Sequence, residues 1–101
     1  MAVETSETLR ASSVLAIAPR VAVQALGPKE GGVLLRLDSG EMYTVNDTTL
    51  DFLQRIDGTR TIAAIVEELT SFIDVAAATL TSDLIEVAGE LRKESLIAIV
   101  R

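Results

Sequence analysis

The sequence predicts an α+β domain in which a three-stranded antiparallel sheet is followed by three helices. Three observations predict it: three short aliphatic runs in the first half, strong turn signals between them, and apolar residues at helical spacing in the second half. Strands and helices are segregated along the chain, which favours α+β over a parallel sheet. With 101 residues, the chain has the length of one domain.

The strands are expected over residues 20–26, 33–37 and 41–45. Gly27–Gly32 is rich in turn residues, and Asp38–Gly40 fits a three-residue hairpin loop. The simplest topology is a meander with residues 33–37 in the middle, which leaves residues 41–45 at an edge. By alternation, Tyr43 and Val45 share one face, and we expect Val45 to point inward.

Residues 1–18 lack sustained periodicity and are expected to form a flexible lead-in to a domain over residues 19–101. The alternative is a short strand over Val14–Ala18.

The helices begin at recognisable caps. Asn46 is a suitable N-cap for a helix that runs to about Ile56, and Thr61 is suitable for the second. Thr79 or Thr81 is expected to open the third, which extends to about Glu94. The first two helices have apolar stripes formed by Thr49, Phe52, Leu53 and Ile56, and by Ile62, Ile65, Val66, Leu69 and Phe72. Leu96–Val100 is either a last strand or a packed tail.

The third helix has three different faces at 100° per residue. The core stripe is Leu84, Val87, Ala88 and Leu91, and the solvated acidic face is Asp83, Glu86, Glu90 and Glu94. A less charged shoulder contains Thr81, Ile85, Gly89 and Arg92. Two interpretations stay open: Ile85 widens the core contact, or the shoulder is a groove wall with apolar surface, room at Gly89 and a cation at Arg92.

The amino-acid composition excludes several classes of catalytic and metal-binding site. The chain has no His and no Cys, which removes thiol nucleophiles, His bases and Cys/His zinc sites. Carboxylate pairs, Ser or Thr with Lys, or no catalysis at all remain open, and of these we expect no catalytic residue, no metal and no cofactor. The net charge of −6 opposes binding to a phosphate backbone. No signal peptide or membrane span is apparent, so a cytoplasmic protein with no nucleic-acid or membrane partner is expected.

The chain resembles the PqqD-like family, the peptide-recognition domains called RiPP recognition elements, which serve ribosomally made and post-translationally modified peptides. The resemblance covers residues 20–100 and is carried by Val45-Asn46, Ile56-Asp57-Gly58, Thr59-Arg60-Thr61-Ile62 with Ile65 and Leu69, and then Asp83-Leu84, Val87-Ala88, Leu91 and Leu96-Ile97. It implies a winged helix-turn-helix-like fold. It also implies that a precursor's leader peptide binds as an added strand against residues 41–45, with side chains on the third helix.

Three departures from the family pattern favour a precursor other than that of pyrroloquinoline quinone. Val87-Ala88 is smaller than usual, Ser95 stands where the family often has Gly, and Asp38-Ser39 replaces a common Pro-Glu.

The expected function is a non-catalytic peptide chaperone that presents the leader to a modifying enzyme, such as a radical SAM enzyme, a cyclase or a leader peptidase. It is expected to be a monomer or a homodimer. The expected peptide-binding residues are Glu41, Met42, Tyr43, Thr44, Val45, Thr81, Leu84, Ile85, Ala88, Gly89 and Arg92. The alternatives are a winged-helix DNA-binding or regulatory protein and, less supported, a small enzyme using surface carboxylates.

Overall fold

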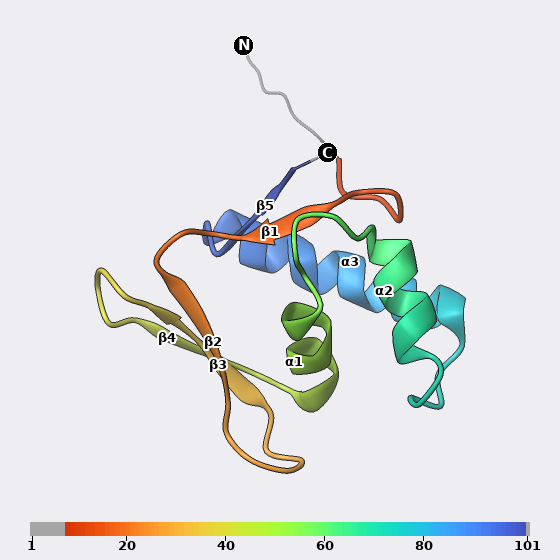
Figure 1. Ribbon diagram of the computed structural model, residues 1–101, viewed down its shortest axis with the longest axis horizontal. Helices are drawn as coiled ribbons and strands as arrows, with labels where there is room; N and C mark the ends of the chain where they lie inside the picture. The colour runs from red at the N-terminus through yellow and green to blue at the C-terminus, as the bar shows by residue number, and fades with distance from the viewer. Residues whose placement is uncertain (1–7, 101) are drawn as a thin grey trace.

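The computed structural model describes residues 8–100 and has the α+β architecture that the sequence predicts. Figure 1 shows a three-stranded sheet on one side of the molecule, three helices on the other, and a small two-stranded ribbon above them. The core between these parts is mainly aliphatic, with Phe52 as its one fully buried aromatic among the described residues.

The sheet is the predicted meander. Its strands are β2 (Val21–Ala25), β3 (Gly32–Arg36) and β4 (Met42–Val45), all antiparallel neighbours in the order β2-β3-β4. Leu34 of β3 lies opposite Tyr43 of β4. The prediction that the third strand of the meander lies at an edge is confirmed.

The first two helices begin at the predicted caps. Helix α1 (Asp47–Gln54) starts after Asn46, whose side-chain oxygen accepts a hydrogen bond from the Thr49 amide at 2.8 Å. Helix α2 (Ile62–Leu69) starts after Thr61, whose hydroxyl accepts from the Ala64 amide at 3.0 Å. These bonds satisfy amides that the first helical turn leaves without a partner.

The third helix begins earlier than predicted. Helix α3 spans Ala77–Lys93, and Ala76 occupies the N-cap position without a side-chain hydrogen bond. Thr79 and Thr81 lie inside the helix, where the Thr81 hydroxyl donates to the Ala77 carbonyl. The prediction of a Thr cap is therefore wrong, because this helix has no capping side chain to mark its start.

Phe72 does not extend the apolar stripe of α2. The helix ends at Leu69, so Phe72 falls in the following turn and its side chain is 55% exposed. The Arg55 guanidinium lies 5.3 Å from the centre of its ring.

Part of the expected lead-in is a strand. Strand β1 (Leu15–Ile17) pairs antiparallel with β5 (Ile97–Ile99), so Leu96–Val100 contains a last strand, not a tail alone. Leu15 is only 1% exposed and belongs to the core. The prediction of a flexible lead-in up to residue 18 is therefore wrong for Leu15–Ile17, and the alternative of a short strand is confirmed. Residues 1–7 of the expected lead-in lie outside the described residues.

Candidate peptide-binding site

Strand β4 has a free edge. The Arg36 amide donates to the Glu41 carbonyl, which sets the alternation of the antiparallel ladder, so Tyr43 and Val45 direct their N–H and C=O groups toward β3. The N–H and C=O groups of Met42 and Thr44 therefore point away from the sheet. Within residues 8–100, no strand pairs with β4 on that side.

The side chains of β4 alternate as predicted. Tyr43 and Val45 are partly buried and pack against the core, whereas Met42 and Thr44 are exposed. Val45 points inward, as expected. The exposed fraction of Met42 is 66%, which gives the free edge an apolar side chain in contact with solvent.

A hollow of about 330 Å³ opens beside the end of β4. Its walls come from the start of α1 and from one flank of α3, and it is lined by Asn46, Thr48, Thr49, Val75, Leu80, Asp83, Leu84, Glu86 and Val87. Since Asn46 follows Val45 directly, the hollow borders the end of β4.

The other end of β4 lies beside the end of α3. The Tyr43 hydroxyl is 3.4 Å from a carboxylate oxygen of Glu94, and the Arg36 guanidinium donates to the Glu94 carbonyl at 2.6 Å. Hydrogen bonding to Tyr43 is the main cause that raises the pKa of Arg36. The hydrogen bonds to Tyr43 and to the Glu94 carbonyl place this cation between the strands and the helix.

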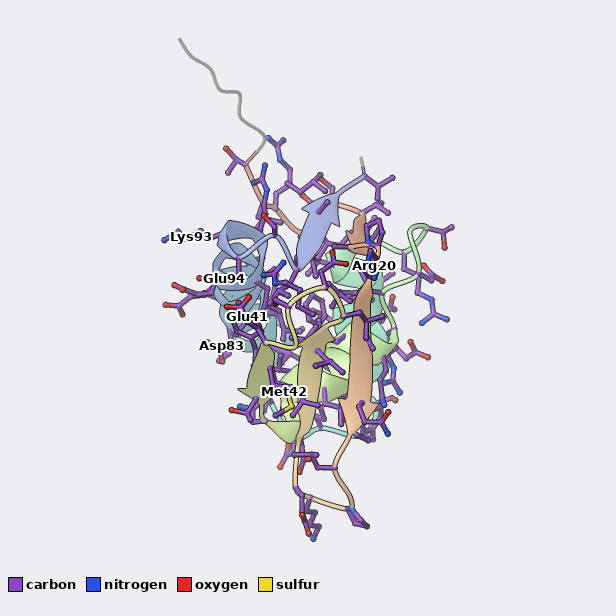
Figure 2. All side chains as sticks on the ribbon, turned by 90° about the vertical axis from the view of Figure 1, so that its left-hand side faces the viewer. Arg20, Glu41, Met42, Asp83, Lys93 and Glu94 are labelled. Atoms are coloured by element: carbon purple, nitrogen blue, oxygen red, sulfur yellow. The ribbon has the colours of Figure 1, made fainter. Side chains whose placement is uncertain are left out.

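These contacts place α3 beside both ends of β4. Glu94 lies near the start of β4, and Asp83 lies near its end, so the strand and the helix run side by side in opposite directions. We call the space along the free edge, from Glu41 and Glu94 to Asn46 and Asp83, the β4–α3 groove. Figure 2 looks onto this side of the molecule, where Glu41, Met42, Asp83 and Glu94 come from both walls.

The shoulder of α3 that the sequence suggested as a groove wall is on the other flank of the helix. A Cβ atom at Gly89 would meet Leu9 at 3.8 Å, and Arg92 lines a separate hollow with residues of β1 and β5. Ile85 packs against the core, and the hydroxyl of Thr81 bonds within its own helix. The structure therefore does not bring these four residues together with β4.

The two other expected residues of α3, Leu84 and Ala88, lie in different surroundings. Leu84 lines the hollow, whereas Ala88 is fully buried in the core. Besides Leu84, the α3 residues that line the hollow are Leu80, Asp83, Glu86 and Val87, and sequence reasoning did not name them as site residues. A helical wheel orders the faces of a helix, but only tertiary placement decides which flank meets the sheet edge. The available signal was that Val87 stands at the edge of the core stripe next to the acidic face.

The groove offers hydrogen-bonding backbone, apolar surface and carboxylates. Among the described residues, no cluster of three or more His, Cys, Asp or Glu side chains is arranged to hold a metal ion. No helix within residues 8–100 is long and apolar enough to cross a membrane.

Fold and groove define a small α+β domain with an open strand edge beside a helix. The model of a protein family described as coenzyme PQQ synthesis protein D (PqqD) matches residues 31–97. The chain belongs to this family.

Curated relatives match part of the chain. The PqqA binding proteins of Xanthomonas euvesicatoria pv. vesicatoria and Xanthomonas axonopodis pv. citri are each 38% identical over 53 residues, which is 52% of this chain. The match spans 58% of the length of each relative.

Solved structures share the fold over most of the chain. The PqqD part of PqqCD from Methylobacterium extorquens, described as a stand-alone RiPP recognition element, is 19% identical with a TM-score of 0.77, over 89% of this chain and 94% of that one. A lasso peptide synthetase B1 complexed with the leader peptide is 25% identical with a TM-score of 0.69, over 83% and 96%. TbiB1 in complex with the TbiA(beta) leader peptide is 18% identical with a TM-score of 0.66, over 80% and 92%.

Proposed function

We propose that this chain binds the leader segment of a ribosomally made precursor peptide as an additional strand along the free edge of β4. The bound leader lies in the β4–α3 groove and is presented to a separate modifying enzyme. The observation that carries the proposal is the outward-facing backbone of Met42 and Thr44 beside the hollow under α3. Membership of the PqqD family supports it, as does the likeness to a protein solved with a leader peptide.

The energetics suit reversible binding. Met42 and Thr44 offer about four backbone hydrogen bonds, each contributing a net ~0.5–1.5 kcal/mol. An aliphatic side chain of the leader in the hollow adds ~1.5–3 kcal/mol. These contacts supply ~3.5–9 kcal/mol before the cost of ordering the peptide is subtracted, so the Kd is micromolar at the tightest. Such an affinity lets the domain release its peptide after modification.

The proposed role is non-catalytic, and the modifying enzyme is a radical SAM enzyme, a cyclase or a leader peptidase. A presenting domain needs no nucleophile or proton-transfer group of its own, which agrees with a chain that has no His and no Cys. DNA binding is disfavoured because Asp83 and Glu86 line the groove and would face the phosphates.

The direct test is amide hydrogen exchange during titration with the synthetic leader of a short precursor peptide found among the genes next to the gene for this chain. We expect binding at about micromolar concentration, with new protection at the amides of Met42 and Thr44. Tyr43 and Val45 already bond to β3 and should change little. Absence of binding at tens of micromolar, or protection that leaves Met42 and Thr44 unchanged, would contradict the proposal.

A matched pair of variants tests which flank of α3 contacts the peptide. Val87 and Ile85 are both partly buried aliphatic residues packed against the core, but of the two only Val87 lines the hollow beside β4. We expect Val87→Ala to weaken leader binding about five- to tenfold, as loss of about 1 kcal/mol of apolar contact predicts. Ile85→Ala should reduce stability to a similar extent but leave the Kd unchanged. Calorimetric titration measures the Kd of both variants. If only Ile85→Ala weakens binding, the peptide contacts the Ile85 flank of α3 and not the Val87 flank.

A further inference from the structure

The α3 wall of the groove is negatively charged along its whole length. Asp83 and Glu86 line the hollow at one end, and Glu94 meets Tyr43 at the other. Glu90 lies one helical turn from Glu86 and one from Glu94, on the same flank. These four residues form what we call the acidic wall.

The four carboxylates of the acidic wall form no ion pair within residues 8–100, although the Arg36 guanidinium donates to the backbone carbonyl of Glu94 at one end. The ion pairs within residues 8–100 involve other acids, and none includes Asp83, Glu86, Glu90 or Glu94. On the sheet side of the groove, Arg36 is paired with Glu41 at 3.1 Å. Lys93 points away from β4 in Figure 2, and Arg92 lines the hollow at β1 and β5. The groove therefore keeps an excess of negative charge.

The spacing of the acids matches an added strand. Carboxylates one turn apart on a helix are about 5.4 Å apart along the axis. Side chains at alternate positions of a strand lie on one side of it, about 6.7 Å apart. A peptide paired to β4 thus directs every second side chain toward the acidic wall. About five of its residues span the distance from Glu94 to Asp83, which is about 16 Å along the helix axis, and two or three of them face the wall.

We propose that the leader recognised by this chain is cationic, with Lys or Arg at alternate positions facing the acidic wall. This inference rests on the proposed function and adds the chemical class of the ligand. An aliphatic side chain fills the hollow at Leu84 and Val87, and the cations meet Asp83, Glu86 and Glu90 around it. Opposite charge steers the peptide to the groove and disfavours acidic segments.

A peptide selection tests this without knowledge of the natural precursor. A random library of 12-residue peptides is selected by mRNA display against three forms of the full chain. These forms are the wild type, the groove variant D83N/E86Q/E90Q and the control variant E30Q/E67Q/D74N. Both variants lose three negative charges, but the control loses them from exposed sites that do not line the hollow. Glu94 is kept because it contacts Tyr43.

We expect the wild type and the control to enrich peptides with Lys or Arg at alternate positions, and the groove variant to lose this enrichment. A fluorescein-labelled peptide selected by the wild type should bind the groove variant about tenfold more weakly and the control unchanged, as the usual strength of exposed ion pairs predicts. Its affinity for the wild type should also fall as salt rises.

The two proposals fail in different ways. If the selected peptides protect the amides of Met42 and Thr44 but show no excess of Lys or Arg, the cationic ligand is wrong and leader binding at β4 stands. An equal loss of affinity in the groove and control variants also overturns the cationic ligand, because net charge alone would explain it. If the peptides bind without protecting those amides, strand addition to β4 is wrong and the inference falls with it.

Discussion

Gly31 controls the junction between the sheet and the first helix. Its φ is +71°, and a Cβ atom at this position would lie 2.1 Å from the Val45 carbonyl oxygen. The Gly31 amide also donates to the Asp47 carboxylate at 2.7 Å. The start of β3, the end of β4 and the first turn of α1 therefore meet at one residue that has no side chain.

Substitution of Gly31 should be costly for this reason. We expect Gly31→Ala to lower the free energy of unfolding by at least about 2 kcal/mol, since a left-handed conformation costs ~1–2 kcal/mol for a residue with Cβ and the contact with Val45 adds to it. Gly40→Ala is the matched control: Gly40 has a φ of +79° but nothing within 4 Å of its Cβ position. Gly40→Ala should lower the free energy of unfolding by only about 1 kcal/mol. Urea unfolding followed by circular dichroism measures both, and equal losses would contradict a steric role for Gly31.

Individual helix starts were predictable only where a side chain marks them. Asn46 and Thr61 cap α1 and α2 with their own oxygens, so the sequence signal and the structural cause are the same group. Ala76 gives no such signal, and the first-turn amides of α3 lack a side-chain acceptor. The Thr residues that looked like caps lie within that helix.

The uncapped start of α3 offers a gain in stability. Ala76 has extended backbone angles, with φ of −61° and ψ of 140°, which suit a capping side chain. We expect Ala76→Ser to raise the free energy of unfolding by ~0.5–1 kcal/mol. Ala78→Ser, inside the first turn, should bring no gain because its hydroxyl is not at the capping position. Thermal unfolding of both variants distinguishes a capping effect from a general effect of Ser. If only Ala78→Ser raises the stability, the predicted capping role of position 76 is contradicted.

The flank of α3 that borders the groove was not predictable at the level of the element. The sequence separates a core stripe, an acidic face and a shoulder, and the structure keeps Leu84, Ala88 and Leu91 buried. The side that meets β4 is marked by the contact between Tyr43 and Glu94, two residues that are 51 positions apart. Local periodicity carries no information on such a pairing.

At the scale of the whole molecule, the meander and the order of the helices follow from local sequence patterns. The two-stranded ribbon of β1 and β5 does not. Leu15–Ile17 is a three-residue strand whose partner, Ile97–Ile99, lies at the other end of the chain. The Gly58 amide also donates to the Leu15 carbonyl at 3.0 Å, which ties the ribbon to the turn between α1 and α2. The two ends of the domain therefore belong to one packed unit.

This closure predicts that the first strand is required for stability. Leu15 is 1% exposed in the core, so Leu15→Ala removes buried methyl groups and leaves a cavity, which should cost ~2–5 kcal/mol of unfolding free energy. Leu26 provides the control, because it is 52% exposed and Leu26→Ala should cost less than about 0.5 kcal/mol. The difference is read from urea midpoints by circular dichroism, since the chain has no Trp. If Leu15→Ala unfolds at the same urea concentration as Leu26→Ala, the β1–β5 ribbon is not part of the cooperative unit, and the domain begins after it.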